Sequence, residues 1–209
     1  MDTMERKGPV SFDAKVKHKE TRDRWPVVLE YEQEGRGPYV VDLSHRKKLD
    51  VQDVNLGAAM PLGLDLPEKV NRCRLDRGIL VSRQGQRQAA VWDLGRGLEE
   101  VPDEPAVTDV TEGLALLALL GREAFSILEK LCGLDLEAAA RTGPALLQGP
   151  VAHVPSQVAV LGDQEHRMVL FTCSRGYGHD MAEVVLEAGA ELGLRPAGER
   201  RFQEWLGSL

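Results

Sequence analysis

The sequence predicts an α+β fold in which mainly antiparallel sheets are flanked by helices. Short runs rich in β-branched and aromatic residues, each bounded by glycine, proline or charge, indicate strands from residue 26 onward. Two of these runs flank a short glycine-containing segment, as the arms of a hairpin do. In the second half of the chain, the spacing of apolar residues changes to that of a helix. Strands, hairpins and helices interleaved in this way are typical of the α+β class.

The first half of the chain is expected to be mostly sheet. Residues 26–31, 38–42 and 78–82 each predict a strand. The run at 88–94 follows the third strand across Gln84-Gly85-Gln86, which predicts a hairpin with a glycine in its loop.

The second half alternates strands and helices. Gly113 and Gly121 bracket the apolar run at 114–120 so closely that a buried strand is the better interpretation than a helix. Residues 122–131 carry apolar side chains on one helical face, with Gly133 at the expected C-terminal cap. Beyond it, the pattern predicts a short helix at 136–140, strands at 157–161 and 167–173, and a helix capped by Asp180 that runs to residue 192. The buried stripe of this last helix consists of Met181, Val184, Val185, Ala188 and Leu192.

A proline- and acid-rich connector at residues 96–105 is the best candidate for a boundary within the chain. It separates an expected first lobe at 26–101 from an expected second lobe at 106–209 of the same domain. Before them, residues 1–25 are predicted to form a charged arm in which basic and acidic residues alternate. Mixed charge runs are usually exposed to solvent, so the arm is expected to be a solvated face.

Composition excludes several classes of protein. The 209 residues are 43% hydrophobic and 28% charged, which is typical of a globular chain with a core and not of disordered, collagenous or membrane proteins. A net charge of -7 argues against nucleic acid as the default partner. Three cysteines without paired spacing indicate a reducing compartment, and the longest apolar run, at 114–120, is much shorter than the ~20 residues that span a bilayer. We therefore expect a cytoplasmic protein with neither nucleic acid nor membrane as partner.

The residue patterns alone point to little chemistry. Asp42, Ser44 and His45 lie within four positions, but the members of a nucleophilic triad normally meet from distant segments. A turn in which Asp42 or Ser44 bonds backbone amides is the favoured interpretation. The five histidines are scattered, so no metal site is predicted.

The segment around Cys173 allows two interpretations. Arg175 and His179 are close enough in sequence to activate the thiol, but a buried, inert strand cysteine is the favoured alternative. The nearby Gly176-Tyr177-Gly178 lacks the third glycine of a dinucleotide-binding turn.

Three motifs, taken in order, resemble a known family. Residues 40–45 are similar to the D-[VL]-S-H signature of the folate-binding aminomethyltransferases, the glycine cleavage T protein family, and residues 117–124 resemble its L-x-G-P-x-A junction. Residues 174–184 look like a version, one residue shorter, of its R-T-G-Y-T-G-E-D-G turn. The resemblance covers residues 25–193 and implies a two-lobed, aminomethyltransferase-like domain. The length, too short for the carboxy-terminal barrel of the T protein, is similar to that of the gamma subunit of heterotetrameric sarcosine oxidase.

The departures from the family bear on activity. The resemblance implies an acidic residue on the second arm of the hairpin, where this chain has Ala90, and Asp93 lies about 10 Å farther along a strand. It also implies a folate-anchoring glutamate where His179 stands. We therefore expect no catalytic residue and no bound metal. The expected remnant is a vestigial folate site with tetrahydrofolate as its candidate ligand, formed by Tyr177, His179, Asp180, Asp42, Ser44 and His45.

Three functions follow as hypotheses. The first is a non-catalytic, sarcosine oxidase gamma-like subunit that packs against larger flavin- or folate-binding subunits of a one-carbon or amine-metabolism complex. The second is a tetrahydrofolate-dependent aminomethyl or methyl transferase, or a demethylation component, with a rearranged pocket using Asp93, His179 and Tyr177. The third is a free-standing regulatory or scaffold protein that forms a homodimer or another homo-oligomer.

Overall fold

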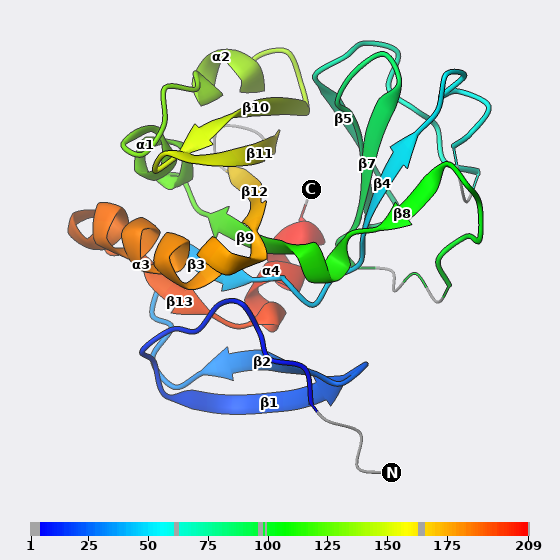
Figure 1. Cartoon of the computed structure of the whole chain (residues 1–209). Helices are drawn as coiled ribbons and strands as arrows, with labels where there is room; N and C mark the ends of the chain where they lie inside the picture. The colour runs from blue at the N-terminus through cyan, green and yellow to red at the C-terminus, as the bar shows by residue number, and fades with distance from the viewer. Residues whose placement is uncertain (1–4, 61–62, 96–97, 99, 163–165, 209) are drawn as a thin grey trace.

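One sheet of eleven strands forms the frame of the molecule (Figure 1). In this computed structural model, the described residues are 5–60, 63–95, 98, 100–162 and 166–208. The strand order is β13-β3-β9-β12-β11-β10-β5-β6-β7-β4-β8, and every neighbouring pair of these described strands is antiparallel except β13 and β3. The strands are β3 (Tyr39–Asp42), β4 (Lys48–Gln52), β5 (Arg72–Asp76), β6 (Ile79–Arg83), β7 (Gln88–Asp93), β8 (Val107–Asp109), β9 (Leu114–Leu120), β10 (Ala145–Val151), β11 (Val154–Leu161), β12 (Met168–Ser174) and β13 (Arg195–Ala197).

Strand β9 lies inside the sheet and is buried on both faces, because its side chains alternate between two cores. Leu117 and Leu119 join a cluster covered by the helices α1 (Ala124–Glu129), α2 (Leu136–Ala140) and α3 (Gly178–Gly189). Leu116 and Leu120 point to the opposite face, where α4 (Glu199–Leu206) packs. The helices therefore flank the sheet on both sides.

The far half of the sheet curls back toward the core that contains α4. On β6 and β7, Leu80 and Trp92 point to this shared core, whereas Val81 and Val91 belong to a third cluster on the outer face. Strands β6 and β7 therefore bury side chains on both of their faces.

A separate two-stranded sheet packs beside the frame. It consists of β1 (Val16–Arg22) and β2 (Trp25–Tyr31), joined by a two-residue turn at Asp23 and Arg24, both of which have positive φ. Gly198, just before α4, allows the backbone of β2 to approach closely, because a Cβ there would lie 2.2 Å from the carbonyl carbon of Leu29.

Most predicted elements are confirmed. The strands expected at 26–31, 38–42, 78–82, 114–120, 157–161 and 167–173 correspond to β2, β3, β6, β9, β11 and β12, and the hairpin across Gln84-Gly85-Gln86 is formed by β6 and β7. The helix expected at 136–140 is α2. Strands β1, β4, β5, β8, β10 and β13 and helix α4 were not predicted.

The charged arm contains a strand that was not predicted, because residues 16–22 form β1 and pair with β2, and β1 is exposed as expected. Two predicted details are wrong. The helix expected at 122–131 is shorter, with Lys130 at its C-cap in place of Gly133. Asp180 lies in the first turn of α3, and Tyr177 occupies the N-cap, because the short 3-10 turn at Arg175–Tyr177 brings the chain into the helix earlier than expected.

The connector expected at 96–105 does not interrupt the sheet. Residues 96, 97 and 99 of this connector lie outside the described residues. Strand β8, which follows it, pairs with β4 from the expected first lobe, and β3 from that lobe pairs with β9 from the second. The division into two lobes stays a prediction.

Substitution of Gly198 tests the close approach of β2. We expect Gly198→Ala to lower the free energy of unfolding by about 3 kcal/mol, because the added methyl group meets main-chain atoms that cannot rotate away. Gly57→Ala is the matched control, since a Cβ at Gly57 has no atom within 4 Å. Urea unfolding measures both, and equal stability of the two variants would contradict the packing described.

Candidate functional site

The first motif forms a tight turn at the end of β3. The amide of Ser44 donates to Asp42 Oδ1 at 2.9 Å, and the Ser44 hydroxyl oxygen accepts from the amide of Leu116 at 3.1 Å. Burial raises the pKa of Asp42, and the hydrogen bonds from Ser44 oppose that shift. The turn interpretation of Asp42 and Ser44 is confirmed, because both side chains satisfy backbone groups.

His45 is held in a buried cluster of charges centred on Glu199. Its Nε2 lies 2.8 Å from Glu199 Oε1, and only 7% of the His45 side chain and 5% of the Glu199 side chain are exposed. Arg22 of β1 makes two contacts with the same carboxylate, at 3.0 and 2.9 Å, and Arg46 forms a further ion pair with it. We call Arg22, His45, Arg46 and Glu199 the Glu199 cluster.

The electrostatics of the cluster explain why Glu199 stays ionised. Burial by itself raises the pKa of this carboxyl, but the hydrogen bonds from His45 and Arg22 and the charge of Arg46 outweigh burial. The net result is a pKa well below the usual range. Glu199 also begins α4, where the helix dipole favours a negative charge.

Lys48 is a second buried charge beside the first motif. Its side chain is fully buried, and Nζ donates to the carbonyl oxygens of Ser44 and Arg46, each at 2.8 Å. Burial lowers its pKa to about 7, while the charges of Asp42 and Asp109 act in the opposite direction. Lys48 therefore holds the loop after β3 in place through hydrogen bonds to two of its carbonyl groups.

The glycine turn lies on the outer surface at the start of α3. Tyr177 is 51% exposed. His179 Nδ1 lies 3.2 Å from the hydroxyl of Ser11, and its Nε2 lies 3.4 Å from Glu183 on the same helix. Asp180 is exposed as well. The three side chains are thus directed to solvent and to neighbouring surface groups.

The two motifs share a neighbour, the N-terminal segment. Ser11, which contacts His179, lines the same cavity as Asp42 and His45. No hydrogen bond or ion pair described in the structure joins the first motif directly to Tyr177, His179 or Asp180. The structure therefore places the predicted residues on two sides of this segment and does not combine them into one site.

A hollow of about 570 Å³ opens on the sheet beside the glycine turn. Gln148, Gln157 and Thr172 lie in register on adjacent strands across it, and Ser174 stands at the point where β12 passes into the turn. The other lining residues are Leu114, Gly149, Pro150, Pro155, Ser156 and Cys173. None of these lining residues is charged at neutral pH, and burial raises the pKa of Cys173 to about 11, which confirms the inert interpretation of its thiol.

The two positions compared with the family's acid point to different faces. Ala90 is buried in the core that contains α4. Asp93 is three positions later, hence on the opposite face of β7, where it accepts hydrogen bonds from the amides of Gly95 and Leu98. Asp93 thus holds the loop after β7 and does not replace an acid at Ala90.

Sequence reasoning missed Glu199 and Lys48. Glu199 is 154 residues from His45, and no local pattern connects them. Lys48 is the last residue of the basic run Arg46-Lys47-Lys48, which is an ordinary pattern for an exposed segment.

The described parts of the chain contain neither a metal-binding cluster nor a membrane-spanning helix. No group of three or more His, Cys, Asp or Glu side chains is arranged to hold a metal ion. No described helix has the length and apolar character that crossing a membrane requires.

Glu199→Gln tests the cluster. We expect the variant to lose about 3 to 5 kcal/mol at neutral pH, because removing the carboxylate leaves the buried guanidinium of Arg46 without its partner. The low pKa of Glu199 contributes stability above the unfolded pKa of about 4.3, and this contribution is lost as the pH falls. Urea unfolding at neutral and acid pH should therefore show wild type and variant converging in acid. Glu187→Gln, on the exposed side of α3, is the matched control and should change little at either pH.

Burial of Lys48 predicts a pH dependence of the same sign on the alkaline side. Its folded pKa of about 7 lies below the unfolded value of about 10.4, so the unfolded chain binds more protons between these values. The free energy of unfolding should rise with pH in this window, by up to about 1.4 kcal/mol per pH unit from this group. Lys48→Met should lose that slope, and an unchanged slope would contradict the buried state of the amine.

Comparison with solved structures supports the α+β fold. No protein-family model and no curated protein sequence matches the chain. A chain of the heterotetrameric sarcosine oxidase from Corynebacterium sp. U-96, in complex with pyrrole 2-carboxylate, matches with a TM-score of 0.58 at 18% sequence identity. The match covers 73% of the present chain and 83% of that chain, so the matched chain is the shorter of the two. The protein has a fold similar to that of a sarcosine oxidase subunit.

Proposed function

We propose that the protein is a non-catalytic, accessory subunit of a multi-subunit complex of one-carbon or amine metabolism, in a role similar to that of the gamma subunit of sarcosine oxidase. The observation that carries the proposal is a fold similar to that of a short chain from such an oxidase, combined with motif side chains that are committed to internal contacts. The partners would be larger subunits that bind flavin or folate.

The internal contacts of the motif side chains argue against catalysis. A general acid or base must reach a substrate, whereas His45 is bound to Glu199 and Asp42 to Ser44. The lining of the hollow beside the glycine turn offers no carboxylate or imidazole. The three cysteines are unpaired, which supports a reducing compartment and hence the cytoplasm.

A tetrahydrofolate-dependent transferase is the second candidate. The observation in its favour is the size of the hollow beside the glycine turn, about 570 Å³, because ligand pockets usually measure about 300 to 1,000 Å³. Against it, Asp93 is buried on another face and His179 is on the outer surface, so the rearranged pocket that would use them is not assembled.

The state of the protein in its own cells tests the accessory role. We expect the untagged chain, isolated without denaturation, to elute as a stoichiometric member of a larger complex that has the visible absorbance of a flavin. Native mass spectrometry then gives the composition. Recovery of the chain only as a monomer or a homo-oligomer would contradict the proposal.

Titration calorimetry distinguishes the transferase candidate. We expect millimolar tetrahydrofolate to release no saturable heat with the isolated chain, and Ala90→Asp to restore none. Saturable binding that Gln157→Leu abolishes, together with one-carbon transfer by the isolated chain, would favour the transferase and reject the non-catalytic role.

A further inference from the structure

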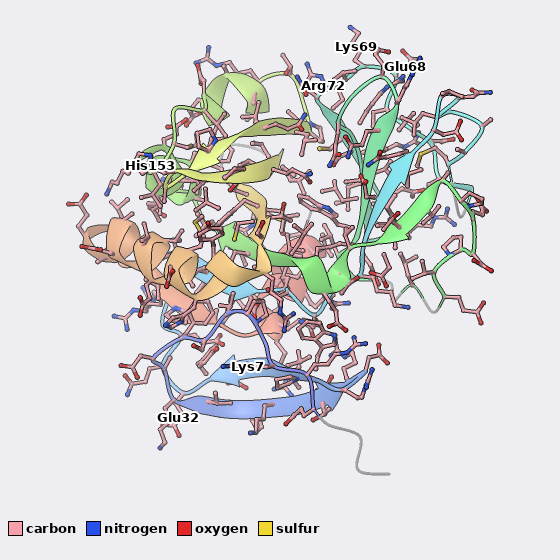
Figure 2. All side chains as sticks on the ribbon, in the orientation of Figure 1. Lys7, Glu32, Glu68, Lys69, Arg72 and His153 are labelled. Atoms are coloured by element: carbon pink, nitrogen blue, oxygen red, sulfur yellow. The ribbon has the colours of Figure 1, made fainter. Side chains whose placement is uncertain are left out.

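A second, partly enclosed cavity lies beneath the N-terminal segment, separate from the hollow beside the glycine turn. Its volume is about 340 Å³. One wall is formed by residues 6–12, which we call the strap, and the other by β2. Figure 1 shows the strap in dark blue as an arch between the β1–β2 hairpin and α3, and Figure 2 labels Lys7 on this side of the molecule.

The strap is held mainly by side chains. It belongs to no helix or strand, and the amide of Arg6 donates to the carbonyl of Arg24 at 2.7 Å. The guanidinium groups of Arg6 and Arg175 lie 5.5 and 5.3 Å from the ring centre of Trp25, and Arg175 also donates to the carbonyl of Lys7. A segment with few main-chain bonds and a cavity beneath it has low local stability, so it can open without unfolding of the core.

The strap also depends on a glycine of α3. A Cβ at Gly178 would lie 2.8 Å from the carbonyl oxygen of Pro9, so only a residue without a side chain allows the strap to lie this close to the helix. The strap is thus seated at a defined place, between α3 and β2.

The walls of the cavity are largely apolar and its end is polar. Val10, Phe12, Val27 and Tyr31 line the walls, and the rings of Phe12 and Tyr31 meet edge to face at 6.2 Å. Asp42 closes the end together with His45. A cavity of this size and composition is suited to a small ligand with an apolar body.

The carboxylate of Asp42 sets the chemistry of the polar end. Its oxygens accept hydrogen bonds from Ser44, and a carboxyl group has further acceptor sites that Ser44 does not fill. Of the basic groups nearby, Lys48 donates to carbonyl oxygens, His45 contacts Glu199, and Lys7, which also lines the cavity, is exposed to solvent. A ligand that donates a hydrogen bond to Asp42 therefore fits this end better than an anion does.

We propose that this cavity binds a small, mostly apolar molecule whose polar head donates a hydrogen bond to Asp42, and that the strap moves to admit it. The site goes beyond the accessory role and does not depend on it.

Two probes with the same ring test the chemistry in the intact protein. Benzyl alcohol offers a neutral donor, and benzoate offers an anion without one. In an NMR titration we expect benzyl alcohol to shift the amide signals of Phe12, Val27 and Val28 saturably, and benzoate to bind about tenfold more weakly or worse. Absence of saturable shifts with benzyl alcohol, or equal binding of both probes, would overturn the proposal.

Two variants locate the site. Asp42→Asn removes the negative charge and should bring benzoate close to the affinity of benzyl alcohol, whereas persistent rejection would mean that Asp42 does not face the ligand. Val27→Phe fills the cavity and should abolish binding of both probes. Val54→Phe, at a position 80% exposed, is the matched control and should bind like wild type. Thermal unfolding verifies that each variant is folded, and the comparison of the two probes on wild type does not depend on any variant.

Hydrogen exchange tests the movement of the strap. We expect the amides of residues 8 and 10–12 to exchange faster than those of β9, and Arg175→Ala to accelerate them further without affecting β9. Arg141→Ala, at an exposed arginine beyond α2, is the control. Exchange of the strap at the rate of β9 would show that the strap opens only with global unfolding, and would overturn the gating step.

Discussion

The carboxylate of Glu199 joins three segments that are far apart in the chain. Arg22 brings in the β1–β2 hairpin from 177 residues away, and His45 and Arg46 bring in the loop after β3. Burying a carboxylate is costly, and the cluster offsets that cost by surrounding it with basic groups and hydrogen bonds. Strand β13 pairs with β3 up to Ala197, and α4 begins two residues later at Glu199. The ion pairs of Glu199 therefore also hold the start of the last helix against the sheet. The hairpin, the first motif and α4 therefore depend on one interaction.

The sequence predicted those elements whose local pattern agrees with their burial. Strand β9 is apolar at every position and closely bracketed by glycines, and the hairpin of β6 and β7 has a glycine in its turn. The missed strands have patterns that local reasoning assigns elsewhere. Strand β1 is almost entirely polar, and β10 contains Gly149 and Pro150. Their strand conformation depends on pairing with β2 and β11 in hairpins, an effect that the propensities of single residues do not contain.

The candidate site was predictable only in part for the same reason. The turn formed by Asp42 and Ser44 is local, and its side chain to backbone bonds could be expected from residue type. The partner of His45 could not, because Glu199 approaches through the packing of α4 against the sheet. The resemblance to the family identified these residues but did not indicate which internal contacts their side chains make. A histidine that would be a ligand group in an open site is held here against Glu199 within a buried cluster.

The cavity beneath the N-terminal segment has one firmly held side, which includes His45 of the Glu199 cluster, and one weakly held side, the strap. His45 belongs both to the cluster and to the cavity lining, so the polar end of the cavity is fixed by buried charge. The opposite wall is the strap. Its position depends on the contact of the Arg6 guanidinium with the Trp25 ring and on the close approach of Pro9 to Gly178. A rigid polar end positions a ligand's head group, and a weakly held apolar wall lets the ligand enter. The contact with Glu199 that holds His45 in place thus gives the neighbouring cavity the fixed geometry that selective binding requires.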